Sequence, residues 1–179
     1  NTLKFCLPSK KDIKKSSITG RNSLILISEL MTNGSINPII AKYLKSQGKD
    51  HDKMNPTIRS KIIFGVAATM KQIHRHHLLY EVLNLKNVFL DENLEPKLGD
   101  FIHGPFKRMI PLEDTIYHTL PIYKAPEILI FEDEGYSFAS DVYSFAIFLY
   151  LMFSLSVQLP DKSFAKTFEQ RIECGERYK

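Results

Sequence analysis

The stretch of residues 78–101, LLYEVLNLKNVFLDENLEPKLGDF, constrains the fold of this chain more than any other part of its sequence. Residues 88–90 are a β-prone apolar run, residues 91–93 are a polar turn sequence, and residues 96–98 form a returning run. The pattern predicts a tight β-hairpin, preceded by a short apolar approach at residues 78–79 and a polar loop at residues 84–87. Because polar residues stand at the ends of these short strands, we expect the hairpin to present a functional site.

The same stretch resembles the catalytic loop and metal-binding step of eukaryotic protein kinases, most closely those of the tyrosine-kinase-like group. That family carries H-R-D-L-K-x-x-N, two short strands and then D-F-G. Here the loop reads YEVLNLKN at residues 80–87, and the later step reads DFI at residues 100–102. Valine stands where the family has its catalytic Asp, and asparagine stands where it has the loop Lys. The resemblance therefore gives four degenerate catalytic positions, Tyr80, Glu81, Val82 and Asn84.

Both metal-ligand positions of the family keep a suitable residue in this sequence. The resemblance places them at Asn87, in the loop, and at Asp100, after the hairpin. It thereby implies Mg²⁺ and ATP as cofactors. The resemblance gives this binding as possible, weak or absent. The glycine-rich phosphate loop and the strand Lys of the family would lie upstream of this sequence, so the sequence leaves nucleotide binding open.

The run SLILISELMTNGSI at residues 23–36 resembles the strand and hinge along which the family holds adenine. The alternative is a buried strand that ends in an Asn-Gly turn. The nucleotide-binding positions that the resemblance implies are a gatekeeper at Ser28, a hinge at Glu29, Leu30 and Met31, and a hairpin residue at Phe89.

Two motifs further along complete the resemblance. Residues 121–127 read PIYKAPE, which is similar to the P-x-Y-x-A-P-E that closes the family's activation segment. Residues 136–146 resemble the start of the central helix, whose opening acid, here Asp141, braces the catalytic-loop backbone. Leu120 and Ile102 depart from the family's Thr and Gly.

Periodicity and turn signals outline the remaining elements. We expect strands at residues 1–5 and 23–28, and helices at residues 36–45, 56–74 and 164–174. Residues 103–123 match the activation segment in position and length. In that segment Lys107 or Arg108 could pair with Glu81, which stands at the family's Arg position. The alternative is that both basic side chains are solvated and Glu81 faces water.

The resemblance implies an α+β, protein-kinase-like fold, mostly the α-helical C-lobe with the last strands of the N-lobe sheet. We expect residues 1–31 to be the end of the N-lobe with the hinge and residues 32–179 to be the C-lobe. The chain would then be a partial kinase-like domain, truncated at both ends, and a fragment of a longer protein. Its 179 residues, of which 44% are hydrophobic, suffice for one globular core.

Composition and residue spacing indicate the partners, the compartment and the metal binding to expect. The formal net charge is +4, and the basic residues gather in residues 10–21, which form either a solvated loop or a docking patch for an acidic partner. Two distant cysteines, Cys6 and Cys174, indicate a reduced, cytoplasmic protein. The apolar run at residues 142–157 is shorter than the roughly 20 residues of a membrane span. We expect it to be a core helix, apolar on all sides, whose face at residues 142–152 lies in the core. Three histidines lie at residues 74–77, without the fourth ligand that a zinc site requires, and we expect them to be ordinary exposed histidines at a helix end.

Two functions remain open from the sequence. The first is a catalytically inactive, pseudokinase module that acts as a signalling scaffold or allosteric binding domain for other signalling proteins, with no nucleic-acid or membrane partner. The second is an active ATP-dependent kinase that phosphorylates Ser/Thr or Tyr with a non-standard loop. The joint change of Val82, Asn84, Ile102 and Leu120 favours the first. The oligomeric state stays open.

Overall fold

The computed structural model of the chain describes residues 5–6, 27–46, 54–100, 121–130 and 135–155. Parts of the predicted strands 1–5 and 23–28, namely residues 1–4 and 23–26, lie outside these residues. So do residues 103–120 of the predicted activation segment at 103–123 and the whole predicted helix at 164–174. In chain order the elements are β1 (Phe5–Cys6), β2 (Ile27–Ser28), α1 (Ile36–Lys45), α2 (Pro56–Arg75), β3 (Val88–Leu90), β4 (Pro96–Leu98), the 3₁₀ turn η4 (Pro121–Tyr123), α3 (Pro126–Ile130) and α4 (Phe138–Ser154).

Helix α2 is the longest element and forms where the apolar periodicity predicts it. The side chain of Asn55 accepts a hydrogen bond from the Ile58 backbone N–H at 2.9 Å, and Pro56 occupies the first helical position. The apolar stripe then faces the core, and its buried members are Ile62, Val66, Met70 and Ile73. The helix runs one residue further than the sequence predicts, to Arg75.

The predicted hairpin is confirmed. Strands β3 and β4 pair antiparallel, with Val88 opposite Leu98. One oxygen of the Asp91 carboxylate accepts hydrogen bonds from the backbone N–H groups of Asn93 and Glu95, each at 2.9 Å. An Asp side chain that bonds to the backbone just after it stabilises a tight turn. This contact explains why the chain reverses between the two strands.

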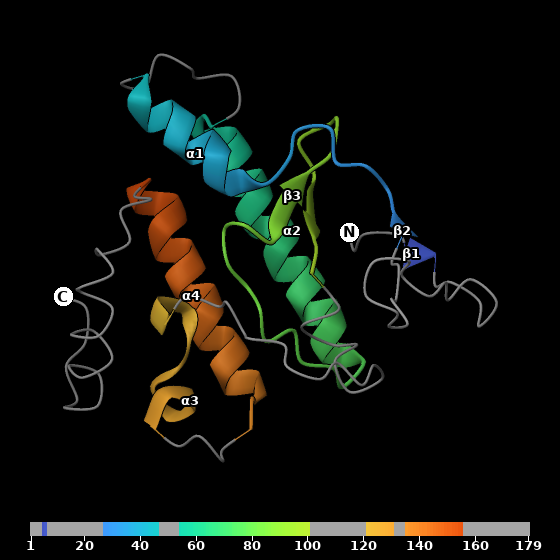
Figure 1. The fold of residues 1–179 in the computed structure, drawn as a ribbon, viewed down its shortest axis with the longest axis vertical. Helices are drawn as coiled ribbons and strands as arrows, with labels where there is room; N and C mark the ends of the chain where they lie inside the picture. The colour runs from blue at the N-terminus through green and yellow to red at the C-terminus, as the bar shows by residue number, and fades with distance from the viewer. Residues whose placement is uncertain (1–4, 7–26, 47–53, 101–120, 131–134, 156–179) are drawn as a thin grey trace, which may run out of the picture.

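The short apolar approach at residues 78–79 contains no strand. Leu78 donates its backbone N–H to Ile73 O, which closes the end of α2, and Tyr80 and Val82 donate theirs to Asp141 Oδ2 and Tyr80 O. These donors are therefore not free to pair with a neighbouring strand. Residues 78–83 form an irregular loop between α2 and the hairpin (Figure 1).

The hairpin packs on α2, and α4 lies beside the same helix (Figure 1). Gly65 permits the close approach of hairpin and helix, because a Cβ at this position would lie 2.4 Å from Pro96 Cγ. Segment 33–36 and the start of α1 cover β3, with Asn33 N–H donating to Leu90 O at 3.3 Å and Leu90 N–H donating to Gly34 O at 2.9 Å. The loop at residues 80–87 therefore connects two elements that pack against each other, α2 and the hairpin.

The sequence predicts α4 to be a core helix that is apolar on all sides, with its buried face starting at Val142. The structure buries Phe148, Leu151 and Met152 but leaves Val142 60% and Phe153 69% exposed. One face of α4 is thus buried and another is open, so the prediction is wrong for Val142. Within the described ranges, no helix is both long and apolar enough to cross a membrane.

The two strand pairs are small, and helices carry most of the described fold. This is the α+β, helix-rich architecture that the sequence predicts. Strands β1 and β2 pair antiparallel, as expected for the end of a sheet, with Phe5 opposite Ser28. The division of the chain at residue 31 stays a prediction.

Candidate functional site

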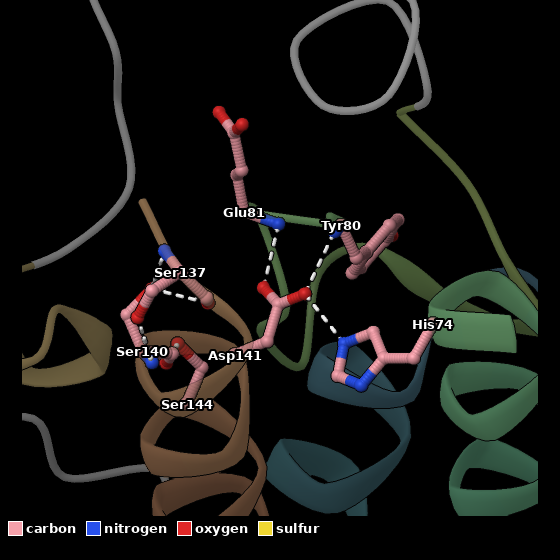
Figure 2. A network of polar contacts seen from close by, with 7 residues as sticks. All are labelled: His74, Tyr80, Glu81, Ser137, Ser140, Asp141 and Ser144. Atoms are coloured by element: carbon pink, nitrogen blue, oxygen red, sulfur yellow. Dashed lines mark hydrogen bonds and ion pairs between the residues drawn. The ribbon is translucent and has the colours of Figure 1, made fainter. Parts of the chain in front are cut away.

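The loop at residues 80–87 is anchored by the carboxylate of Asp141, which is 1% exposed in the first turn of α4. Ser137 begins that helix in a reciprocal cap with Ser140, which fixes the direction of the turn. One carboxylate oxygen of Asp141 accepts from Glu81 N–H at 2.8 Å and the other accepts from Tyr80 N–H at 2.8 Å (Figure 2). The predicted bracing role of Asp141 is confirmed.

His74 also reaches this carboxylate, with its Nε2 atom 2.9 Å from Asp141 Oδ2 (Figure 2). Its ring lies edge-on to Phe138, with centroids 4.9 Å apart, and its side chain is 23% exposed. The sequence treats His74 as an ordinary exposed histidine, which is wrong. The position of His74 in the last turn of the predicted helix, just before the loop, could have indicated a contact with the residues that hold the loop. No cluster that could hold a metal ion occurs among histidines, cysteines and acids in the described ranges.

The backbone at Glu81 adopts a left-handed conformation, with φ of 66°. Such a conformation is costly for a residue with a Cβ and is kept only where the surroundings enforce it. The Asp141 contact supplies that restraint. The Glu81 side chain points away from Asp141 (Figure 2), and the residue is 8% exposed. The basic partners predicted for it, Lys107 and Arg108, lie outside the described residues.

Tyr80, at the family's His position, is fully buried, and its hydroxyl donates to Gly99 O at 2.6 Å. Burial raises the pKa of Tyr80 well above its ordinary value, and the nearby carboxylates of Asp100 and Asp141 raise it further. Tyr80 is thus a neutral donor that ties the loop to the segment after β4.

Val82, at the position of the family's catalytic Asp, is 3% exposed and belongs to the hydrophobic core. An isopropyl group offers neither a proton acceptor nor a hydrogen bond to a hydroxyl. Its backbone carbonyl is used within the loop, because it accepts from Asn84 Nδ2 and from Asn87 Nδ2, both at 2.9 Å. The site therefore holds no general base at the position where the family has one.

Asn84, at the position of the family's loop Lys, directs its amide into the loop. Besides the bond to Val82 O, its Oδ1 accepts from Lys86 N–H at 2.8 Å and from Asn87 N–H at 3.2 Å. A Lys side chain could not supply this acceptor. Asn84 is therefore a brace of the loop backbone.

The two metal-ligand positions lie together, with Asn87 Nδ2 3.3 Å from Asp100 Oδ2. Because a carbonyl only accepts, the bond to Val82 O fixes the Asn87 amide with its nitrogen toward the loop. The same nitrogen donates to Asp100 Oδ2, so the amide N–H group, and not Oδ1, faces the carboxylate. An amide oxygen and a carboxylate are residue types that Mg²⁺ takes together with water and phosphate, but in this arrangement the amide oxygen does not join the carboxylate.

The nucleotide-binding positions fall on two neighbouring segments. In the hinge, Glu29 Oε1 lies 3.4 Å from Lys97 Nζ of β4, and Leu30 is 85% exposed. Met31 begins the turn at Gly34, because its carbonyl accepts from Gly34 N–H. Phe89 of β3 bridges to Ser35 just beyond that turn. Phe89 thus lies against the segment that follows the hinge. The structure describes Ser28 as the end of β2 and does not describe its side chain.

The PIYKAPE motif is joined to the loop through Tyr123. Its hydroxyl oxygen accepts from Leu85 N–H at 3.3 Å, and its carbonyl accepts from Ser144 Oγ of α4 at 2.7 Å. Burial raises the pKa of Tyr123 to about 12, although the bond from Leu85 acts in the opposite direction. The sequence identified the motif but not these two contacts, since they join segments distant in the chain.

Comparison with known proteins shows the family of the chain. The profile of the protein kinase domain matches residues 13–178. A probable L-type lectin-domain containing receptor kinase of Arabidopsis thaliana is 29% identical over 138 residues, which cover 72% of this chain and 20% of the relative.

Two further relatives differ in kind. The ephrin type-A receptor 1 of Mus musculus is 27% identical over 160 residues, 87% of this chain and 15% of the relative. A probable inactive leucine-rich repeat receptor-like protein kinase of Arabidopsis thaliana is 31% identical over 134 residues, 70% of this chain and 14% of the relative. The chain thus spans a fifth or less of the length of these relatives. Because the family profile covers nearly the whole sequence, the chain belongs to the protein kinase family.

Proposed function

We propose that this chain is a pseudokinase domain, a protein kinase fold that serves as a signalling scaffold or allosteric binding module and does not transfer phosphate. The observation that carries the proposal is the buried Val82 side chain at the position of the base. Loss of a general base alone typically slows a reaction by about 10²–10⁴. That loss lowers the rate without abolishing it, so a second defect matters.

The second defect is the loss of the positively charged loop Lys, whose position Asn84 occupies. Phosphoryl transfer depends mainly on positioning and on positive charge near the transferred group. Both polar atoms of the Asn84 amide are engaged within the loop, and the amide carries no charge. The loop therefore lacks a proton acceptor and a cation at the two positions where the family has them.

The placement within the family and the cellular setting are also proposals. We assign the chain to the tyrosine-kinase-like group, with other signalling proteins as partners and the cytoplasm as its location. A probable inactive kinase among its relatives supports an inactive domain of this kind. The domain would then act by binding.

One observation favours the alternative of an active kinase. Asn87 and Asp100 still lie within hydrogen-bonding distance, and both are residue types that can bind Mg²⁺. Protein kinase domains generally use ATP and Mg²⁺. Retained metal binding is compatible with a nucleotide-binding scaffold as well as with residual catalysis, so only the transfer reaction separates the two.

The experiment measures transfer of labelled phosphate from ATP, with Mg²⁺ or Mn²⁺, to generic Ser, Thr and Tyr substrates. We expect no transfer above the level of an Asp100→Ala control. A wild-type rate within the roughly 1–100 s⁻¹ of ordinary kinases, lost in both Asp100→Ala and Asn87→Ala, would establish the active alternative.

A further inference from the structure

We propose that the Asn33–Gly34 step is a site of spontaneous deamidation, and that the reaction releases the hinge segment, residues 29–35, from the hairpin of β3 and β4. The sequence contains no other Asn-Gly pair. Glycine after asparagine favours this reaction, because the missing Cβ lets the backbone nitrogen approach the side chain. The inference goes beyond the proposed function and does not depend on whether the domain transfers phosphate.

The covalent step needs no reactant other than water and its hydroxide. Hydroxide takes the proton of the Gly34 backbone nitrogen, which then attacks Cγ of the Asn33 side chain. The side-chain nitrogen takes up a proton from water and leaves as ammonia, and a cyclic succinimide remains. Water then opens the ring at either of its carbonyls and gives aspartate or isoaspartate at position 33. The net change is loss of ammonia and gain of water, with no oxidation or reduction.

Both reacting groups are engaged in the folded chain. The nucleophile, Gly34 N–H, donates to Met31 O at 3.0 Å. The leaving group, Asn33 Nδ2, donates to Asp91 O at 2.7 Å. Two backbone bonds hold the same residues against β3, from Asn33 N–H to Leu90 O at 3.3 Å and from Leu90 N–H to Gly34 O at 2.9 Å. Cyclisation therefore requires this turn to open first.

The turn is nevertheless accessible to solvent. Asn33 and Gly34 are both partly exposed. Apart from chain neighbours, no heavy atom of the described residues lies within 4 Å of the position that a Cβ of Gly34 would take. Segments held by a few hydrogen bonds near the surface open locally more often than the whole domain unfolds. Local opening therefore brings water and hydroxide to the reacting atoms.

The product cannot keep the contact with the hairpin. A carboxylate at position 33 has no donor for Asp91 O, so two acceptors would meet where the amide bond now spans 2.7 Å. It also adds negative charge next to Asp91, whose carboxylate already shares Lys97 with Glu29 at 3.7 and 3.4 Å. Isoaspartate further lengthens the backbone by a methylene group, which displaces the bridge between Ser35 and Phe89. The reaction is therefore a one-way release of the hinge segment.

The first experiment follows conversion at position 33 by peptide mass spectrometry, in the full chain at mildly alkaline pH, folded and unfolded in guanidinium chloride. In the unfolded chain we expect Asn33 to convert faster than Asn93, an internal reference that is followed by leucine. In the folded chain we expect conversion to be slower by about 10–100-fold, because the hydrogen bonds of the turn must break first. Equal rates in the two states, or Asn33 no faster than Asn93 when unfolded, would overturn the proposal.

Two variants test whether local opening sets the rate. Lys97→Gln removes the ion pairs that join Glu29 of the hinge to Asp91 of the hairpin. We expect it to speed conversion in the folded chain by about two- to fivefold, as for a partly exposed ion pair, with no change in the unfolded chain. Lys61→Gln is the matched control, since its ion pair to Glu95 joins the hairpin to α2, and it should keep the wild-type rate. Equal folded-state rates for Lys97→Gln and the wild type would contradict control by opening.

The second experiment tests the release itself by backbone hydrogen exchange at Gly34 and Leu90. Asn33→Asp represents the product, and Asn33→Ala removes the donor to Asp91 O without adding charge. We expect exchange of both amides to be faster than in the wild type by about two- to tenfold in Asn33→Ala, and by more in Asn33→Asp. Wild-type exchange in Asn33→Asp would overturn the release. Neither experiment bears on phosphate transfer, which the labelled-phosphate assay decides separately.

Discussion

Asp141 holds Glu81 in a left-handed backbone conformation: the Asp141 Oδ1 atom lies 2.8 Å from Glu81 N, and φ of Glu81 is 66°. The Asp141 carboxylate is 1% exposed and accepts from two backbone N–H groups, so its role is to hold the loop. The contact that fixes the loop backbone is therefore present although the family's catalytic Asp and Lys are replaced by Val82 and Asn84. This is expected if the function of the domain depends on the shape of the loop.

The first prediction concerns this restraint. Asp141→Ala should lower the free energy of unfolding by about 1–3 kcal/mol for each of the two buried N–H groups, of Tyr80 and Glu81, that it leaves without an acceptor. Urea denaturation measures the change. Asp141→Asn is the matched control, because its one remaining oxygen should retain roughly half of the effect. Equal stability of Asp141→Ala and the wild type would contradict the assigned role.

A second prediction concerns the contact between α2 and the hairpin. Gly65→Ala should destabilise the fold by about 1–3 kcal/mol, because the new methyl group would overlap the ring of Pro96. Helix propensity alone predicts the opposite, a gain of about 1 kcal/mol for replacing glycine in a helix. The sign of the change in unfolding free energy thus tests the packing. Gly135→Ala, with open space around its Cβ, should be nearly neutral.

Local sequence signals were sufficient for much of this fold. The start of α2 at Pro56, the whole of α1 and both hairpin strands lie where capping, periodicity and turn residues predict them. These elements are specified by contacts between residues a few positions apart. The resemblance also placed Asp141 under the loop, a contact between distant residues that periodicity alone could not give.

The features that the sequence did not predict share one cause. His74, Tyr123 and Ser144 make their polar contacts with residues far away in the sequence, and nothing in their local context marks these partners. The exposed side of α4 was missed for the same reason, because an all-apolar helix carries no signal of which face has a neighbour. The brace formed by Asn84 was equally hidden, since the sequence shows a lost Lys but not what an amide could gain.

A third prediction concerns the end of α2, where His77 has φ of 55°. His77 N–H donates to His74 O at 2.9 Å and Leu78 N–H donates to Ile73 O at 3.2 Å, the bond pattern of a helix end that favours glycine. His77→Gly should therefore stabilise the protein by about 1 kcal/mol. The thermal midpoint and the urea midpoint should both rise. His76→Gly is the control and should destabilise slightly, because φ of His76 is −89°.

The last prediction concerns alkaline pH. Burial raises the pKa of Tyr123 to about 12 and raises that of Tyr80 well above its ordinary value. In the unfolded chain both phenols ionise near pH 10. Above about pH 10 the unfolded state therefore binds fewer protons than the folded state, so stability is fully present below that pH and falls as pH rises toward about 12.

The measurement is the free energy of unfolding as a function of pH for the wild type and three variants. Tyr123→Phe and Tyr80→Phe should each reduce the slope above about pH 10, by an amount on the order of 2–3 kcal/mol for Tyr123 across the whole window. Both should also lower stability at neutral pH, since Leu85 N–H and Gly99 O each lose a partner. Tyr150→Phe alters a half-exposed tyrosine on α4 and should keep the wild-type slope. If all four proteins lost stability in parallel, deprotonation of other groups would account for the decline, and the buried phenols would not control it.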